Sequence, residues 1–199
     1  NCSVPDAPDL AIALTYYSPY VSGLTNMARD IAEGLAARGR AVTVVTSHFD
    51  SGLPLEVEIN GVRVLRAPVL ARVGRGVISP QLVALGRRTL GRARVASLQL
   101  PMLEAGAIAA GLRTPLVSTY HCDVTLPPGL VNDVQRVVVD ASNRLAMRRS
   151  VAVAVTSEDY ARHSRMWPSI EPAMHVVAPP CPEPPAGRPN YRETDGPHI

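Results

Sequence analysis

The chain has 199 residues, of which 46% are hydrophobic and 19% are charged, as expected for an ordinary globular protein that is long enough to bury a core. Its net charge of +3 is too small to indicate nucleic acid as a partner. Aromatic residues make up only 4%, so the core must be built from Val, Leu, Ala and Ile, which suits a parallel sheet.

The three cysteines give no sign of a disulfide framework or a metal site. Cys2, Cys122 and Cys181 are an odd and widely spaced set, which favours a reducing cytoplasm. No run approaches 18 apolar residues, so the sequence predicts no membrane-spanning helix. The start of the chain has no signal-peptide pattern, and residues 1–9 form a polar leader that we expect to be poorly ordered.

Strand and helix signals alternate along most of the chain. Residues 10–16 form a short apolar run that predicts a strand, and residues 17–24 form a loop. Residues 25–38 carry apolar side chains at three- and four-residue steps, which predicts an amphipathic helix that ends near Gly39. Residues 41–46 predict a second strand, so these elements form a βαβ unit with parallel strands.

The alternation continues to residue 178. Asn60-Gly61 lies between β-prone residues, in a pattern typical of a tight hairpin turn. The other expected elements are helix 79–92, strand 95–100, helix 103–112, strand 115–120, helix 130–149, strand 151–156, helix 158–165 and strand 175–178. The sequence therefore predicts the α/β class, with a Rossmann-like domain over residues 10–178 and a mostly parallel sheet flanked by helices.

The end of the chain differs in composition. Seven of the 19 residues in 179–197 are Pro, which prevents regular helix or sheet hydrogen bonding and is typical of a semi-rigid spacer. We interpret residues 179–199 as a Pro-rich linker, in which Pro197-His-Ile199 begins the first strand of another domain.

The loop over residues 17–24 separates a strand from the start of a helix. Ligands of open α/β sheets bind beyond the carboxyl ends of the strands, and a helix N-terminus favours phosphate. Gly23 would let a ligand approach the backbone closely, although a plain turn with a Ser or Thr helix cap explains the same residues. The GxGxxG and Walker patterns are absent, which argues against a nicotinamide enzyme or an NTPase.

A second candidate follows the predicted strand 115–120. His121 would lie at the carboxyl end of that strand, and its ordinary pKa suits acid–base work or hydrogen bonding to a hydroxyl. A histidine that caps the strand or sits in a crease between domains is the alternative. Cys122 between His121 and Asp123 resembles a metal site, but three adjacent residues cannot all converge on one ion.

Two further polar residues follow predicted strands. Glu104 opens a helix, where the dipole favours a carboxylate in any case, and Ser157 can act simply as a helix cap. Four candidates follow strands that we expect to be parallel, and they should therefore gather at one edge of the sheet: Gly23, Glu104, His121 and Ser157.

The segment from Arg72 to Arg94 places several arginines among apolar residues. A basic amphipathic helix in this segment would make a peripheral contact with an anionic membrane or lie beside a lipid acceptor. The alternative, which we prefer, is a solvated helix face whose other side lies in the core.

Several stretches, taken in order, resemble retaining GT-B glycosyltransferases of the large bacterial group 1 or family 4 type. The resemblance covers nearly the whole chain. The matching stretches are Tyr16-Tyr-Ser-Pro-Tyr-Val-Ser-Gly-Leu-Thr25, residues 35–46, the Gly-Val hairpin Asn60-Gly-Val-Arg-Val-Leu-Arg66, Leu100-Pro-Met-Leu-Glu-Ala-Gly106, Pro115-Leu-Val-Ser-Thr-Tyr-His-Cys-Asp123 and residues 155–160.

The resemblance implies that this chain is the acceptor-binding half of an enzyme with two Rossmann-like domains. The other half would bind a UDP- or GDP-sugar, and the acceptor hydroxyl would belong to a glycan or a lipid-linked molecule. We expect neither a metal ion nor a cofactor. The implied roles are donor phosphate contact for Ser22 and Gly23, catalysis for His121, and contact on the acceptor side for Tyr17, Glu104, Asp123 and Ser157.

The sequence departs from the family pattern at two places. The first loop has one Gly, Gly23, where members often have two, and Gln99 stands in the region where a His is frequent. Two alternatives stay open: half of a GT-B-like nucleotide-sugar epimerase, and a non-catalytic Rossmann-like binding module. The binding module predicts no charged or polar cluster at the ends of the strands.

Overall fold

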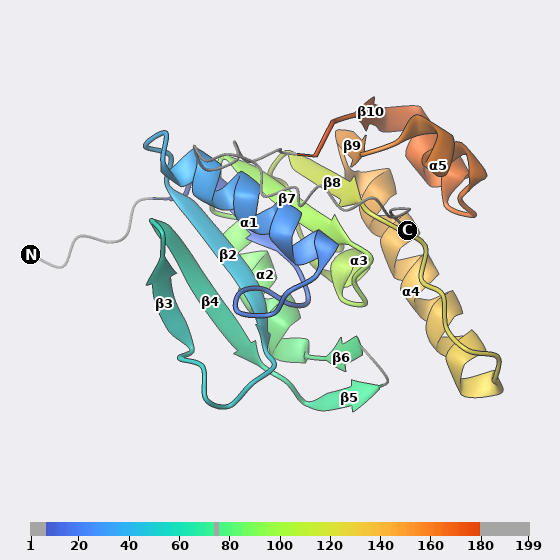
Figure 1. Cartoon of the computed structure of the whole chain (residues 1–199), viewed down its shortest axis with the longest axis horizontal. Coiled ribbons are helices and arrows are strands. Elements are labelled where there is room, and N and C mark those ends of the chain that lie inside the picture. The colour runs from blue at the N-terminus through green and yellow to red at the C-terminus, as the bar shows by residue number, and fades with distance from the viewer. Residues whose placement is uncertain (1–6, 74–75, 180–199) are drawn as a thin grey trace, which may run out of the picture.

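The computed structural model describes residues 7–73 and 76–179 (Figure 1). Most of the expected linker, including Pro197-His-Ile199, lies outside the described residues, as do Cys2 and Cys181. In chain order the elements are β1 (Leu10–Ala13), α1 (Gly23–Ala36), β2 (Val42–His48), β3 (Glu56–Ile59), β4 (Val62–Pro68), β5 (Ala71–Val73), β6 (Gly76–Ile78), α2 (Pro80–Leu90), β7 (Val95–Leu100), α3 (Ala105–Ala110), β8 (Leu116–Tyr120), α4 (Leu130–Arg149), β9 (Ala152–Val155), α5 (Glu158–His163), α6 (Trp167–Ile170), a 3₁₀ turn (Glu171–Ala173) and β10 (Met174–Val176).

The α/β prediction is confirmed. Within the described residues, eight strands form one sheet in the order β10-β9-β8-β7-β1-β2-β4-β3. Every neighbouring pair in this sheet is parallel except β3 and β4. The strand order reverses at β1, which pairs with β2 on one side and with β7 on the other, and such a reversal leaves a crevice where ligands bind.

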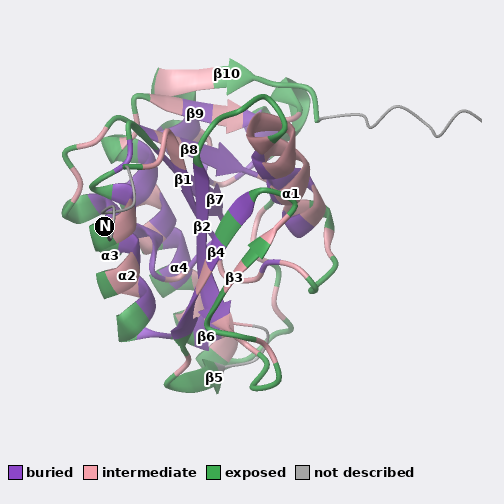
Figure 2. Ribbon diagram, turned by 90° about the vertical axis from the view of Figure 1, so that its left-hand side faces the viewer, coloured by how far each residue is buried: buried purple, intermediate pink, exposed green. Residues whose placement is uncertain are grey.

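Helices cover both faces of the sheet (Figure 2). Ile12 of β1 and Val44 of β2 pack with Ala28 of α1 in one apolar cluster. On the opposite face, α2 and α3 contribute residues such as Leu82 and Ile108 to a second and larger cluster. The core is therefore mostly aliphatic on both sides of the strands, with one buried tyrosine in each cluster, Tyr17 and Tyr120.

The start of the folded part and the segment before α2 differ from expectation. Asp9, which we placed in the leader, accepts a hydrogen bond from the backbone N–H of Ala41 and forms an ion pair with Arg94. The segment from Arg72 is no continuous basic helix, because β5 and β6 form an antiparallel hairpin and α2 begins only at Pro80, capped by the Ser79 hydroxyl.

Helix α2 lies against the sheet, with Leu82 and Leu90 buried and Arg87 and Arg88 exposed. The interpretation as a solvated helix face fits this packing. No helix in residues 7–73 and 76–179 combines the length and apolar character that crossing a membrane would require.

The hairpin between β3 and β4 is confirmed. Its strands are antiparallel, and Val62 pairs with Ile59 across the turn. Asn60 has φ = 49° and Gly61 has φ = 78°, the positive angles of a type I′ turn, which Gly adopts without steric cost.

Replacing Gly61 should therefore destabilise the protein. We expect Gly61→Ala to lower the free energy of unfolding by about 1 kcal/mol or more, because a β-carbon disfavours the left-handed conformation. Gly34→Ala is the matched control, since Gly34 lies inside α1 and an added β-carbon there meets only the flexible Arg38 side chain, at 3.4 Å. Urea denaturation of both variants measures the difference, and equal stabilities would contradict this account of the turn.

Candidate active site

A cavity of about 920 Å³ opens at the carboxyl ends of the central strands. Its walls come from the loops after β1, β7, β8 and β9, from the start of α1, from β6 and from α4. The cavity thus lies at the point where the strand order reverses, the usual ligand site of this sheet type. Its volume is in the range of small-molecule sites.

Two of the residues expected at this edge, Gly23 and His121, line the cavity together, and Ser22 lines it as well. The Ser22 hydroxyl accepts a hydrogen bond from the Thr25 backbone N–H (3.1 Å) and so caps α1. The first N–H groups of a helix have no partner within the helix, which leaves those of Gly23 and Leu24 directed toward the cavity end of α1. A β-carbon added at Gly23 would meet nothing within 4 Å, so the backbone there borders open space.

A chain of buried polar groups holds His121. Its Nε2 lies 2.8 Å from Oε1 of Gln99. The Gln99 amide nitrogen donates to Oγ of Ser97 (3.0 Å) and to Oγ1 of Thr119 (3.3 Å). With Oε1 of Gln99 as the acceptor, His121 donates through Nε2–H, and in this tautomer its Nδ1 carries a lone pair.

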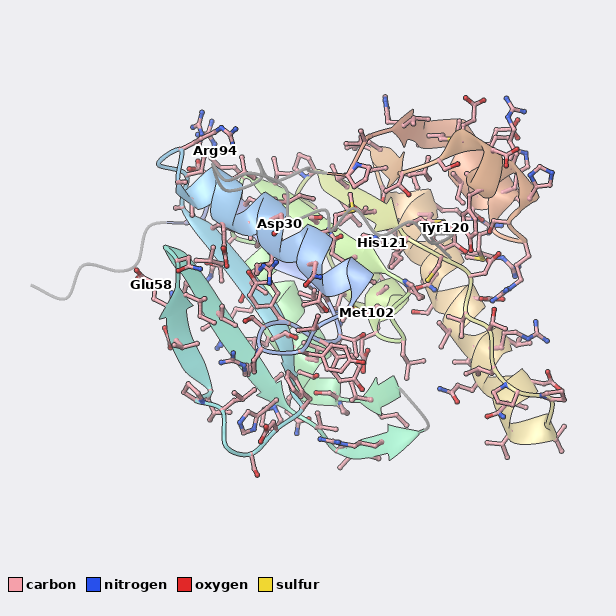
Figure 3. The ribbon with its side chains drawn as sticks, in the orientation of Figure 1. Asp30, Glu58, Arg94, Met102, Tyr120 and His121 are labelled. Carbon is pink, nitrogen blue, oxygen red and sulfur yellow. The ribbon has the colours of Figure 1, made fainter. Side chains whose placement is uncertain are left out.

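Burial lowers the pKa of His121 to about 4, since a protonated imidazole would lose hydration without gaining a counter-charge. The ring is therefore neutral near pH 7. Figure 3 shows His121 with Tyr120 at the end of β8. In this tautomer, His121 can accept a hydrogen bond from a hydroxyl group bound in the cavity.

Asp123 holds the loop that follows β8. Its Oδ1 accepts hydrogen bonds from the hydroxyls of Tyr120 and Ser164 and lies 3.5 Å from a guanidinium nitrogen of Arg165. Its backbone N–H donates to the hydroxyl of Tyr160 (2.9 Å). These contacts engage Oδ1 and the backbone, so the structure gives Asp123 an anchoring position beside the cavity.

The aromatic residues of the first loop are distributed differently from what we expected. Tyr17 is fully buried in the core under α1, and burial raises the pKa of its hydroxyl. Its neighbours Tyr16 and Tyr20 line the cavity instead, with ring centroids 4.6 Å apart, and Phe49 packs edge-on against both. The aromatic side chains open to a ligand are therefore those of Tyr16 and Tyr20.

Glu104 and Ser157 each make a hydrogen bond to the backbone near the start of a helix. Glu104 is buried, its Oε1 accepts a hydrogen bond from the Ser79 backbone N–H (3.1 Å), and burial raises the pKa of its carboxyl. It thus joins the loop after β7 to the start of α2. The Ser157 hydroxyl accepts from the Tyr160 backbone N–H (3.2 Å) and caps α5, and the adjacent Thr156 lines the cavity.

The remaining lining is largely apolar, which sequence reasoning missed. Val131, Val134 and Val138 of α4 face the cavity, together with Val77 and Ile78 of β6. None of the described lining residues is Asp, Glu, Lys or Arg. Among residues 7–73 and 76–179, no group of three or more His, Cys, Asp or Glu side chains is placed to hold a metal ion.

The fold matches one half of two-domain glycosyltransferases of the GT-B type. Sucrose-phosphate synthase from Thermosynechococcus elongatus superposes with a TM-score of 0.65 at 17% identity, over 85% of this chain and 47% of that chain. HepE from Anabaena in complex with UDP superposes with a TM-score of 0.57 at 18% identity, over 86% of this chain and 44% of that chain. A UDP-glucose: anthocyanidin 3-O-glucosyltransferase in complex with UDP superposes with a TM-score of 0.54 at 12% identity, over 92% of this chain and 56% of that chain.

The chain thus spans about half the length of each of these three solved structures. The family model of the glycosyl transferase 4-like domain matches residues 22–181. The chain therefore belongs to this family, as the resemblance in the sequence implied. No curated protein sequence matches the chain.

The neutral state of His121 predicts a pH dependence of stability. Between pH 6.5 and about 4 the unfolded histidine binds a proton that the folded one does not, so through this group the free energy of unfolding rises with pH across that window. His121→Gln removes the titrating ring while keeping an N–H donor for Gln99.

Urea denaturation at pH 5 and pH 7 should therefore show a smaller stability difference in His121→Gln than in the unsubstituted chain. The other histidines are common to both proteins and cancel in the comparison. An unchanged pH dependence would mean that His121 is not held neutral by burial.

Proposed function

We propose that this domain is the acceptor-binding half of a retaining glycosyltransferase, which transfers a sugar from a UDP- or GDP-sugar to a hydroxyl group. The observation that carries the proposal is the cavity at the strand reversal, where the open start of α1 at Gly23 and the neutral ring of His121 line one space. Family membership and the UDP-bound relatives support it.

The start of α1 suits the leaving phosphate of the donor, and His121 suits the hydroxyl of the acceptor. In the transfer, the acceptor oxygen forms a bond to the anomeric carbon, while the bond from that carbon to the phosphate oxygen breaks. The electron pair leaves with the nucleoside diphosphate, and the hydroxyl proton passes to the leaving phosphate. The N–H groups at the start of α1 would stabilise the growing negative charge on the phosphate.

His121 would orient a hydroxyl in this scheme. Its Nδ1 lone pair can accept a hydrogen bond from the acceptor or from the transferred sugar, and the Gln99 contact (2.8 Å) fixes the ring. No described residue of the cavity lining offers a carboxylate, so none of those lining residues can act as a carboxylate nucleophile. This favours a mechanism in which the acceptor attacks without a covalent intermediate on this domain.

The polar cluster at the strand ends favours an enzyme over a plain binding module, because a module needs no buried histidine with an open lone pair. The test is product analysis of an enzyme in which this domain is joined to its nucleotide-binding half. Proton NMR of the product should show transfer with the anomeric configuration of the donor retained. Hydrolysis or epimerisation without transfer would contradict the proposal.

Substituting His121 should impair the reaction and spare the fold. In the two-domain enzyme we expect His121→Gln to lower kcat by roughly 10²–10⁴-fold, the usual contribution of a positioned acid–base or hydrogen-bonding group. The melting temperature at pH 7 should change little, since the amide can still donate to Gln99. A folded variant with near-normal turnover would remove His121 from the mechanism.

Gly23 offers an independent test of the phosphate site. Because a β-carbon at Gly23 meets no protein atom, Gly23→Ala should fold normally, yet the added methyl group would displace a phosphate at the helix start. We expect kcat/KM for the donor to fall by roughly 10- to 100-fold. Gly34→Ala, in the same helix and outside the cavity lining, is the control, and equal activity of the two variants would place the phosphate elsewhere.

A further inference from the structure

The first half of α4 exposes apolar side chains that the fold does not explain. Its buried residues begin only at Val139, the tenth of its 20 residues, and continue to Met147. The exposed fractions in the first half range from 49% to 82%, for Leu130, Val131, Val134, Val137 and Val138. Valine is a mediocre helix former, so neither core packing nor helix propensity accounts for it here. An exposed apolar patch of this kind marks a binding surface.

Three of these valines form one wall of the cavity. Val131, Val134 and Val138 recur at helical spacing and line it. Val77 and Ile78 of β6 line the same cavity. The apolar walls are continuous with the polar end at His121, and a concave apolar site of this form takes a small molecule.

The charges around α4 fit an uncharged occupant. The described lining residues include no Asp, Glu, Lys or Arg, and the His121 ring is neutral near pH 7. Arg136, on the exposed half of α4, lies 3.5 Å from Asp133, and Asp140 pairs with Arg165 at 2.6 Å. A phosphate headgroup or an anionic membrane in contact with the exposed valines of α4 would require a cluster of basic side chains around them. Here Arg136 and Asp140 each pair with a residue of opposite charge.

We propose that the acceptor of this domain is an uncharged amphiphile. Its hydroxyl-bearing end would lie at His121, and its alkyl or aryl body would lie between the valines of α4 and the apolar residues of β6. The inference rests on the proposed function, since the polar end is the group that would receive the sugar. It narrows the acceptor class to one with an apolar body and excludes both a purely polar glycan and an anionic lipid.

The test is direct binding to the chain, with no donor present. Hexyl, heptyl and octyl β-glucoside, each below its micelle concentration, are titrated by calorimetry. Affinity should rise by about fourfold with each added methylene, the effect of burying one such group. The N–H groups at the start of α1 belong to the donor end of the cavity. The end at His121, where the head of the acceptor would lie, has no cation, so octyl phosphate should bind more weakly than octyl glucoside, by about tenfold or more.

Matched valine variants locate the site. Val134→Asp and Val138→Asp should each lower the affinity for octyl glucoside by about tenfold or more. Val137→Asp should not, because Val137 is an exposed valine of the same helix that does not line the cavity. Both target positions are solvent-accessible, so the variants should fold, and circular dichroism confirms this before titration.

Several results would overturn the inference. These are affinity independent of alkyl length, equal losses in the three variants, tighter binding of octyl phosphate or of anionic vesicles, and a sedimenting dimer that Val134→Asp dissociates. The last result would mean that a second copy of the chain covers the exposed valines of α4. Binding of alkyl glucosides by a chain whose two-domain enzyme transfers no sugar would reject the proposed function alone, and transfer to polar acceptors without alkyl binding would reject only this inference.

Discussion

The divergence of the chain from β1 and β7 is the constraint on which the site depends. These strands are parallel neighbours, yet their connections leave toward opposite faces of the sheet, α1 on one side and α3 on the other. Right-handed crossovers require this wherever the strand order reverses. The loops that follow the two strands must therefore separate, and the gap between them is the origin of the cavity.

The polar groups inside the cleft are organised by the pleat of the sheet. Ser97 and Gln99 alternate with the buried leucines of β7, and Gln99 pairs in register with Thr119 of β8. Buried polar side chains are tolerated only when they are hydrogen-bonded, and here each satisfies another. With its nitrogen directed at these two hydroxyls, the Gln99 amide presents Oε1 to Nε2 of His121. This arrangement suits the tautomer of His121 that carries its proton on Nε2.

Local patterns in the sequence predicted most of the fold. The bounds of α4 agree with the expected helix 130–149, and the turn at Asn60-Gly61 has the expected positive angles. The hairpin of β5 and β6 was missed because its strands have three residues each, too few for an alternating pattern. Periodicity thus identified the long elements but not this hairpin.

The site was predicted less well, for reasons that lie in tertiary structure. Sequence reasoning selected Tyr17, but the path of the chain after β1 buries that ring and exposes Tyr16 and Tyr20 to the cavity. The apolar face of α4 resembles an ordinary core face in sequence. Only the three-dimensional structure reveals that its first half exposes apolar side chains, three of which line the cavity.

The role of this half is tested most directly by titrating UDP and GDP into the chain alone and measuring the heat of binding. If this domain holds the acceptor and offers the nucleotide only the start of α1 at Gly23, neither nucleotide should reach micromolar affinity, since no contact to the base or the ribose is expected from this half. Micromolar binding of either one would place the nucleotide site in this domain and would contradict its assignment as the acceptor half.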